Sequence, residues 1–366
     1  MKVAIIGAGN GGITACADLK DRGFEVSLFE SDRFSKNLDF IKEQGGVYFC
    51  EGDIVGYNKD VEGKFVKIDL ISKDINEVID GAEVIMIVAP GVAIEYFARI
   101  LAPVVDEDQI ILVNSAASMA PVRFVNEARQ MGIDKSFKIA ETNTLTYGTR
   151  AIVESARVEM YLRVKKVFLA AYPSRYNQEV FEVCSKLYDC FVPAKNILQI
   201  NLENGNPEVH PGPALLNAGR IDFSNGEFWL YREGITEHTV NVLKAVEKER
   251  MELARALGFE VEGALEARQN RGYFSDDDKS LQEHFNTSEV FTQIKGPTSV
   301  TSRYFTEDIS TGLVFWSDLG KALGVKTPNI DAIIVLASSM LQTDFYRDGL
   351  TLEKLGLDRE DLYKTI

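Results

Sequence analysis

The sequence predicts an α/β protein with an N-terminal doubly wound, mostly parallel β-sheet and a second, mainly α-helical domain. Three observations support this prediction. A glycine-rich turn joins a strand to a helix near the start of the chain. Short apolar runs then alternate with helical stretches as far as Pro193, and from Asn196 onward the strand pattern fades while helical spacing continues. We therefore expect two domains, at residues 1–193 and 194–366.

The first element is a short strand that runs into the glycine-rich turn. Residues 3–6 are apolar, as in a strand buried on both faces. The turn that follows reads Gly7, Ala8, Gly9, Asn10, Gly11 and Gly12. In a Rossmann-type domain the first glycine permits the turn, the second lets a pyrophosphate approach the backbone, and the last lets the helix pack against the strand. We expect all six residues to bind a dinucleotide; a plain glycine-rich turn is the alternative.

An acidic residue marks the end of the second strand, which is expected at residues 24–29. A carboxylate there accepts hydrogen bonds from the ribose hydroxyls and repels a 2′-phosphate. Glu30 therefore favours NAD as the cofactor. Arg33 follows three residues later and could hold a phosphate, so NADP is also possible.

Strands and helices continue to alternate after this point. The expected elements are a helix at 32–44, short strands of a β insertion at 47–50, 53–57 and 64–71, and buried strands at 83–88 and 109–113. Ligands of open α/β sheets bind outside the carboxyl ends of the strands. Pro90 and Asn114 follow the last two strands and are candidate cofactor contacts, although Pro90 also ends its strand sterically.

Polar residues follow another expected strand, at residues 137–140. Tyr147 lies in this polar segment and is a candidate substrate contact by position. Capping of a loop by the same residues is the alternative. Later strands are expected at 158–162 and 166–171, with a helix at 177–187.

The second domain shows mainly helical spacing. Helices are expected at residues 213–220, 236–257, 309–323 and 328–341. Thr327 and Pro328 form a good helix start, because threonine can cap the first turn and proline suits the first helical position.

The composition excludes several classes of function. The net charge of −15 argues against nucleic acid and anionic membrane surfaces as partners. The apolar runs are shorter than the roughly 18 residues that span a bilayer. The four cysteines lack metal-ligand spacing, and the three histidines are scattered, so we expect no metal site. These features are typical of a cytoplasmic protein that acts on small molecules and could form a homodimer.

Two polar segments of the second domain are candidates for catalysis. Residues 204–222 read NGNPEVHPGPALLNAGRID, and residues 303–308 read RYFTED. His210 precedes a proline, which disfavours helical geometry, and we expect it at the entrance of a helix. Arg303 can hold a carboxylate through two parallel hydrogen bonds. A structural histidine and a surface ion pair are the alternatives when each segment is considered alone.

Together these segments resemble the octopine/nopaline (opine) dehydrogenase family. The resemblance spans nearly the whole chain and rests on GAGNGG, on NPxxHPGPxLLNAGRID and on RYxTEDxxxGL, which begins at Arg303. It implies a reductive condensation in which an amino acid and a 2-keto acid, such as pyruvate or 2-oxoglutarate, form an imine. NAD(P)H then reduces the imine to a secondary amine dicarboxylate.

The resemblance also implies roles for single residues. His210 stands at the position of the family's catalytic histidine, Asp308 at that of its acidic partner, and Arg303 at that of an arginine that binds a substrate carboxylate. Glu307 is the alternative partner of His210. We expect Asn206 to shape the loop that presents His210 and to lie at the substrate. Another reductase of the same two-domain build, acting on a hydroxy acid or a sugar phosphate, and a non-catalytic NAD sensor are the alternative functions.

Overall fold

The computed structural model describes residues 1–52 and 63–364. The chain divides into two compact units, Met1–Ile200 and Asn201–Ile366. The boundary expected after Pro193 coincides with the end of strand β12 (Phe191–Pro193), and the first unit continues into helix α7 (Ile197–Leu202). The strand expected at 53–57 lies outside the described residues.

The first unit is built on a mostly parallel sheet, as predicted. Its strand order is β12-β11-β8-β7-β6-β1-β2-β5, and the β8–β11 pair is antiparallel. The other strands are β1 (Lys2–Ile6), β2 (Glu25–Phe29), β5 (Leu70–Ser72), β6 (Val84–Ile87), β7 (Ile110–Val113), β8 (Lys138–Thr142) and β11 (Val167–Tyr172). All residues of β6 and β7 are buried, which explains their continuous apolar runs.

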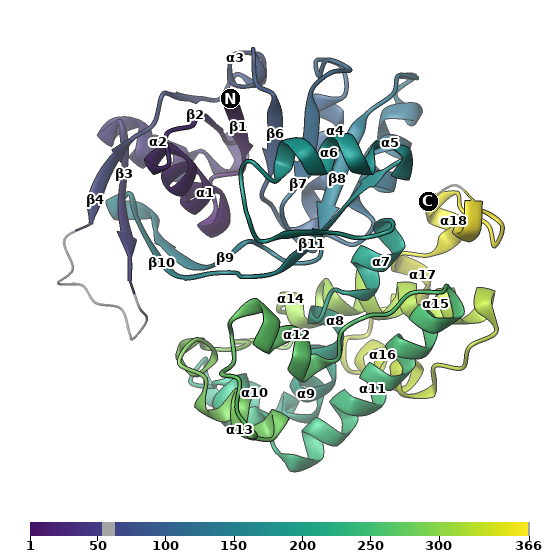
Figure 1. Ribbon diagram of the computed structural model, residues 1–366. Helices are drawn as coiled ribbons and strands as arrows, with labels where there is room; N and C mark the ends of the chain where they lie inside the picture. The colour runs from purple at the N-terminus through teal and green to yellow at the C-terminus, as the bar shows by residue number, and fades with distance from the viewer. Residues whose placement is uncertain (53–62, 365–366) are drawn as a thin grey trace. The chain divides into compact units, whose positions relative to one another are not determined.

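A second sheet in this unit has the order β4-β3-β10-β9. Its strands are β3 (Gly46–Glu51), β4 (Lys64–Lys67), β9 (Tyr147–Ile152) and β10 (Arg157–Arg163). The expected β insertion therefore pairs with strands that come a hundred residues later, β3 with β10 in parallel. Tyr147 begins strand β9 instead of lying in a loop. Helix α1 (Asn10–Asp21) packs between the two sheets (Figure 1), which makes it the central element of the unit.

Further helices complete the first unit. They are α2 (Ser35–Gln44), α3 (Ile75–Ile79), α4 (Ile94–Leu101), α5 (Ala120–Gln130) and α6 (Asn177–Cys184), with 3₁₀ turns η1 (Asp32–Phe34), η2 (Gly91–Ala93), η3 (Val153–Ser155) and η4 (Ser174–Tyr176). Helix α6 is shorter than expected and ends at Cys184. Helices α3, α5 and α6 pack on strands β2, β8 and β11, respectively, and cover the sheet.

All regular elements described in the second unit are helical, as predicted. They are α8 (Asn206–Val209), α9 (Pro211–Leu216), α10 (Ala218–Ser224), α11 (Glu237–Ala256), α12 (Ala264–Arg271), α13 (Leu281–Thr287), α14 (Arg303–Thr306), α15 (Val314–Leu323), α16 (Pro328–Leu341), α17 (Phe345–Asp348), α18 (Leu352–Leu355) and α19 (Asp361–Lys364). The helix expected at 213–220 is two helices that meet at Asn217. The helix expected at 309–323 begins with a π-helical turn, η7 (Asp308–Leu313).

A second π-helical turn, η5 (Leu230–Gly234), and a 3₁₀ turn, η6 (Phe291–Gln293), complete this unit. π-Helical turns are rare, and they occur frequently at functional sites. Among residues 1–52 and 63–364, no helix has the length and apolar character that crossing a membrane requires.

Candidate functional site

The glycine-rich turn of the first unit has the geometry that its spacing predicts. Gly7 has a φ of +112°, a conformation that favours glycine, and a Cβ there would lie 2.6 Å from the carbonyl oxygen of Val88. A Cβ on Gly12 would lie 1.8 Å from the carbonyl oxygen of Gly7, so α1 can approach the turn only with glycine at that position. A Cβ on Gly9 would meet nothing within 4 Å. The backbone at Gly9 is therefore accessible to a ligand.

The other residues of the turn are fixed by neighbouring elements. A Cβ on Gly11 would lie 2.8 Å from Cγ1 of Val88, a side-chain contact that is close but less severe than the backbone clash at Gly12. The exposed Asn10 uses its side-chain oxygen to accept a hydrogen bond from the Ala151 N–H at 3.0 Å. Ala8 is buried. The start of α1 is thus tied to strand β9, and its first N–H groups have the orientation that anion binding at a helix N-terminus requires.

The Glu30 side chain is hydrogen-bonded to the glycine-rich turn. Glu30 is 6% exposed, and its carboxylate accepts hydrogen bonds from the backbone N–H groups of Ala8 and Ser31, both at 2.8 Å. The Ser31 hydroxyl donates a further bond of 3.2 Å. A carboxylate offers about four acceptor positions. Glu30 can therefore brace the turn and still accept a bond from a ribose hydroxyl.

The structure corrects the expected roles of Asn114 and Tyr147. The Asn114 side chain is fully buried, and its Nδ2 donates to the Thr146 hydroxyl at 2.9 Å. The Tyr147 hydroxyl is buried too, 2.7 Å from Oδ2 of Asp18 and 2.8 Å from the Tyr188 hydroxyl. These contacts join strands β7 and β9 to helix α1. Both side chains therefore act inside the unit, and we no longer place them at a ligand.

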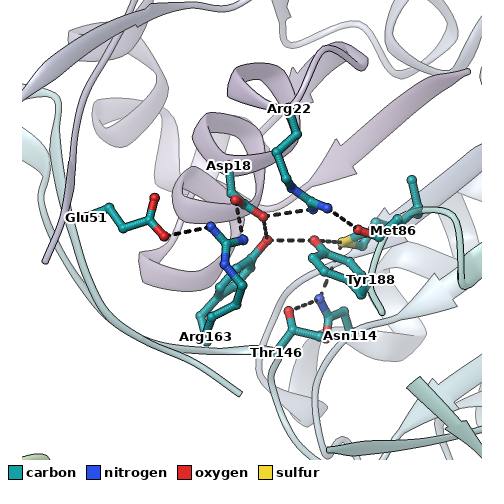
Figure 2. A network of polar contacts seen from close by, with 10 residues as sticks. Asp18, Arg22, Glu51, Met86, Asn114, Thr146, Arg163 and Tyr188 are labelled. Carbon is teal, nitrogen blue, oxygen red and sulfur yellow. Dashed lines mark hydrogen bonds and ion pairs between the residues drawn. The ribbon is translucent and has the colours of Figure 1, made fainter. Parts of the chain in front are cut away.

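Asp18 is the centre of this buried network. Figure 2 shows its carboxylate between the guanidinium groups of Arg22 and Arg163, which both pair with it. Arg22 bonds at 2.9 Å, and Arg163 also pairs with Glu51 at 3.0 Å. Burial raises the pKa of Tyr147 well above its usual range, so its hydroxyl remains a donor to Asp18.

Replacing Tyr147 by phenylalanine tests the structural role of its hydroxyl. We expect the free energy of unfolding to fall by about 1–3 kcal/mol, because Asp18 would lose one of its buried donors. Urea denaturation measures the change, and Tyr48→Phe, which removes a hydroxyl from a more exposed ring of β3, is the control. A substrate ligand without a structural role would leave the unfolding free energy of the Tyr147→Phe protein unchanged.

Pro90 follows strand β6 and directly precedes η2. Its ring is exposed, and its carbonyl oxygen accepts the Ala93 N–H at 3.0 Å. Pro90 thus starts the η2 turn, and its ring is exposed at the surface of the unit.

His210 of the second unit is held through both ring nitrogens. Its Nδ1 lies 2.8 Å from Oδ2 of Asp308, and its Nε2 lies 2.7 Å from the Tyr231 hydroxyl. The Tyr304 ring stacks flat on the imidazole, with 3.9 Å between the centroids and 6° between the planes. The side chain is 11% exposed. Position, tautomer and ring orientation of His210 are therefore all determined by its neighbours.

The backbone of His210 differs from the expectation. Its φ of −89° and ψ of −57° are helical, although proline follows. The His210 N–H donates to the Asn206 carbonyl at 3.0 Å, and the His210 carbonyl accepts from the Ala214 N–H at 3.0 Å. Helices α8 and α9 thus run into one another through His210, and these two hydrogen bonds outweigh the steric preference of the Pro211 neighbour. Asn206, partly exposed, begins this helical segment.

Close packing brings Asp308 to His210. Gly312 of η7 lies against Pro207 of α8, so that a Cβ on Gly312 would be 2.3 Å from Cγ of Pro207. The missing side chain allows η7 to approach the helix that carries His210. Asp308 is the first residue of η7 and Tyr231 belongs to η5, so both partners of the imidazole come from π-helical turns.

Glu307 pairs with a different residue. Its Oε2 accepts a hydrogen bond from Nε of Arg303 at 2.5 Å. The Arg303 side chain is 67% exposed, whereas that of Glu307 is 8% exposed. Asp308, and not Glu307, is therefore the acid beside His210.

Sequence reasoning missed Tyr231 and Tyr304 as neighbours of His210. Tyr304 stands between Arg303 and Asp308 in the segment RYFTED, which was a usable signal. Tyr231 ends the apolar run of residues 228–231, which gave no signal for a polar contact. Phe228 and Leu230 are fully buried, whereas the Tyr231 hydroxyl reaches Nε2 of His210.

In residues 1–52 and 63–364, no group of His, Cys, Asp or Glu side chains could hold a metal ion.

Several known proteins are similar to this chain over nearly its whole length. Residues 193–341 match the family described as NAD/NADP octopine/nopaline dehydrogenase, alpha-helical domain. The chain is 30% identical over 354 residues to an opine dehydrogenase of Arthrobacter sp. (strain 1C), covering 97% of this chain and 94% of that protein. It is 26% identical over 382 residues to the octopine dehydrogenase of Pecten maximus, covering 95% and 92%.

Solved structures share the fold. An octopine dehydrogenase in complex with NADH and agmatine gives a TM-score of 0.78 at 18% identity, covering 99% of this chain and 98% of that one. A yersinopine dehydrogenase with bound NADP⁺ gives a TM-score of 0.70 at 14% identity, covering 99% and 96%. These likenesses confirm the predicted combination of a Rossmann-type domain with a helical domain.

Proposed function

Because the chain belongs to the opine dehydrogenase family, we propose that it joins an amino acid to a 2-keto acid and reduces the imine with NAD(P)H to a secondary amine dicarboxylate. The observation that carries this proposal is the imidazole of His210, which is held by Asp308 on one side and Tyr231 on the other. A buried histidine paired with a carboxylate is suited to proton transfer near neutral pH. We place pyruvate first among the keto acids and 2-oxoglutarate second.

The turn from Gly7 to Gly12 would hold the cofactor. The open backbone at Gly9 suits a pyrophosphate, and Glu30 suits an unphosphorylated ribose. NAD is therefore the preferred dinucleotide, with NADP as the alternative. The bound NADH and NADP⁺ of the two related structures support both. When bound, the nicotinamide supplies the hydride, and the protein supplies position and protons.

Two alanine variants of the glycine-rich turn separate folding from cofactor binding. Gly12→Ala should lower the free energy of unfolding by at least about 1–3 kcal/mol, because the alanine methyl group would overlap the Gly7 carbonyl oxygen. Gly9→Ala should fold normally but bind NADH about tenfold more weakly, which corresponds to about 1.4 kcal/mol. Thermal unfolding and fluorescence titration with NADH measure the two effects. Unchanged NADH affinity in the Gly9→Ala protein would remove this turn from the cofactor site.

His210 and Asp308 would exchange protons with the substrate. Asp308 accepts a hydrogen bond from Nδ1–H, which fixes the tautomer and leaves Nε2 as the nitrogen that exchanges protons. Loss of water from the carbinolamine requires a proton donor, and the protonated imidazole can provide it.

Arg303 would bind a substrate carboxylate. Its Nε is engaged by Glu307, which orients the guanidinium, and the Nη groups can form the hydrogen bonds to the ligand. Asn206, partly exposed at the start of α8, is the other substrate contact that we propose. A homodimer and a cytoplasmic location stay predictions.

A screen of NADH oxidation tests the proposed function. Keto acids are crossed with amino acids, and each pair is assayed with and without the amine. We expect oxidation that requires both substrates. Oxidation with the keto acid alone would indicate a hydroxy acid dehydrogenase, and NADH binding without turnover of any pair would indicate a sensor.

A further inference from the structure

Both ring nitrogens of His210 have hydrogen-bond partners, which limits the path by which a proton can reach or leave the imidazole. Asp308 occupies Nδ1, and the Tyr231 hydroxyl occupies Nε2. The Tyr304 ring covers one face of the imidazole. A proton that leaves or reaches Nε2 in this arrangement passes through the oxygen of Tyr231, since Asp308 serves as the acceptor on the other side.

The Tyr304 ring is a second neighbour of the Tyr231 hydroxyl. It stacks on the imidazole that Tyr231 bonds to, close enough to act on that hydroxyl. Tyr231 is 4% exposed, whereas Tyr304 is only partly buried. The polar atoms therefore lead from the partly buried Asp308 through His210 to Tyr231, and the more accessible Tyr304 lies beside Tyr231. Tyr304 is also the sequence neighbour of Arg303, the proposed carboxylate ligand.

The proposed reaction needs such a path, because it consumes a proton. A keto acid, an ammonium group, NADH and one proton give a secondary ammonium product, NAD⁺ and water. The ammonium contributes three protons and NADH a hydride, whereas the product carries two protons on nitrogen, one new hydrogen on carbon and two in water. One proton per turnover must therefore come from solvent.

We propose that the hydroxyl groups of Tyr231 and Tyr304 form a proton relay, so that His210 exchanges protons with the substrate and with solvent through these two tyrosines. This inference rests on the proposed function. In the dehydration step the Tyr304 hydroxyl protonates the carbinolamine oxygen, the C–O bond breaks, and the nitrogen lone pair forms the C=N bond. Tyr304 regains a proton from Tyr231, and Tyr231 takes one from Nε2. His210 is left neutral, with Nδ1–H on Asp308, and the later uptake of one solvent proton restores it.

The buried surroundings of Tyr231 disfavour a phenolate, so its hydroxyl can pass a proton on but does not hold a negative charge. Burial raises the pKa of its hydroxyl well above the ordinary value, and Tyr304 raises it further. A phenolate therefore does not accumulate, and each hydroxyl must gain a proton as it gives one. The aromatic rings of Phe285 and Phe291 pack on Tyr231, with centroid distances of 5.6 and 4.5 Å, and hold the hydroxyl in place. Three charged groups act on the two tyrosines: Asp308 and Arg268 on the Tyr231 hydroxyl, and Arg303, which Glu307 pairs with, on Tyr304.

Nuclear magnetic resonance of ring-¹⁵N-labelled histidine tests the first link without turnover. The chain has three histidines, and His210→Asn identifies the signal. We expect the Nδ1–H tautomer, with an Nε2 resonance that moves in the Tyr231→Phe protein. Tyr273→Phe is the matched control, because Tyr273 stacks on the same Phe291 ring at 5.0 Å. An Nε2 resonance that is identical in the wild type and in Tyr231→Phe would overturn the relay.

Kinetics test the rest of the path. We expect Tyr231→Phe to lower kcat about 10²-fold, at the low end for loss of a proton-transfer group. The KM of the keto acid should stay within about twofold. Tyr304→Phe keeps the stacked ring and should show a similar loss. Small buffer acids should partly restore kcat in both variants and leave the wild type and Tyr273→Phe unaffected.

The outcomes separate this inference from the proposed function. Normal kcat in Tyr231→Phe overturns the relay while the dehydrogenase function stands. Reduced kcat without rescue by buffer acids also overturns it, because the hydroxyl would then serve only packing. If no substrate pair is turned over by the wild type, the proposed function fails and the relay fails with it, whereas the resonance experiment still shows whether Tyr231 bonds to Nε2.

Discussion

Replacing His210 by alanine is expected to lower kcat for the keto acid and amine pair by about 10³-fold, within the 10²–10⁴ typical of general acid–base catalysis. The variant removes the group that links Asp308 to the tyrosine hydroxyls, so the carbinolamine would lose its proton donor. NADH affinity should stay within about twofold, because the proposed cofactor residues belong to the other unit. Steady-state NADH oxidation and NADH titration measure the two quantities.

The control for this prediction is His238→Ala. His238 is exposed on helix α11 of the same unit, and its removal should leave kcat unchanged. Turnover by His210→Ala at the wild-type rate would exclude His210 from the mechanism. Loss of NADH binding together with kcat would instead point to misfolding, which thermal unfolding of the same sample would reveal.

Arg250→Met is expected to produce the largest loss of stability, about 3–5 kcal/mol in the free energy of unfolding. Nε of Arg250 bonds to Oε2 of Glu208 at 2.8 Å, and both side chains are almost fully buried. Its Nη groups donate to the carbonyls of Leu202 at 2.6 Å and Glu262 at 2.7 Å. Methionine would fill the volume but leave the Glu208 carboxylate charged and largely unpaired, and Glu208 stands two residues before His210.

Tryptophan fluorescence during urea denaturation measures this loss. Both tryptophans of the chain, Trp229 and Trp316, lie in the second unit, so the signal reports on the unit that contains Arg250. Arg255→Met, an exposed position on the same helix, should change the unfolding free energy by less than about 0.5 kcal/mol. In a Glu208→Gln/Arg250→Met double variant the loss should be smaller than in Arg250→Met alone. Equal losses would show that packing, and not the unpaired charge, accounts for the effect.

Much of the first unit could be predicted from local patterns. Strands such as Val84–Ile87 are apolar throughout because they are buried on both faces, and the spacing of Gly7, Gly9 and Gly12 reflects one backbone geometry. The pairing of β3 with β10 was not predicted, since no local pattern specifies which distant strands meet. The same reason hid the buried positions of Asn114 and Tyr147, whose partners lie far away in the sequence.

The site in the second unit was predicted only where motif and chemistry coincide. His210 and Asp308 were expected together, and they lie 2.8 Å apart. The contact between His210 and Tyr231 depends on a π-helical turn, which has no period that an apolar pattern reveals. The helical backbone of His210 was missed because the rule for residues before proline describes an average preference, which two hydrogen bonds can outweigh.

The position of Glu30 has a consequence for engineering cofactor preference. Exchanging such an acid for a small neutral residue is the obvious way to admit the 2′-phosphate of NADP. In this chain the exchange would also leave the N–H groups of Ala8 and Ser31 without their acceptor, so the glycine-rich turn itself would loosen. A redesign for NADP would have to introduce a neutral acceptor at the same place before adding a positive charge nearby.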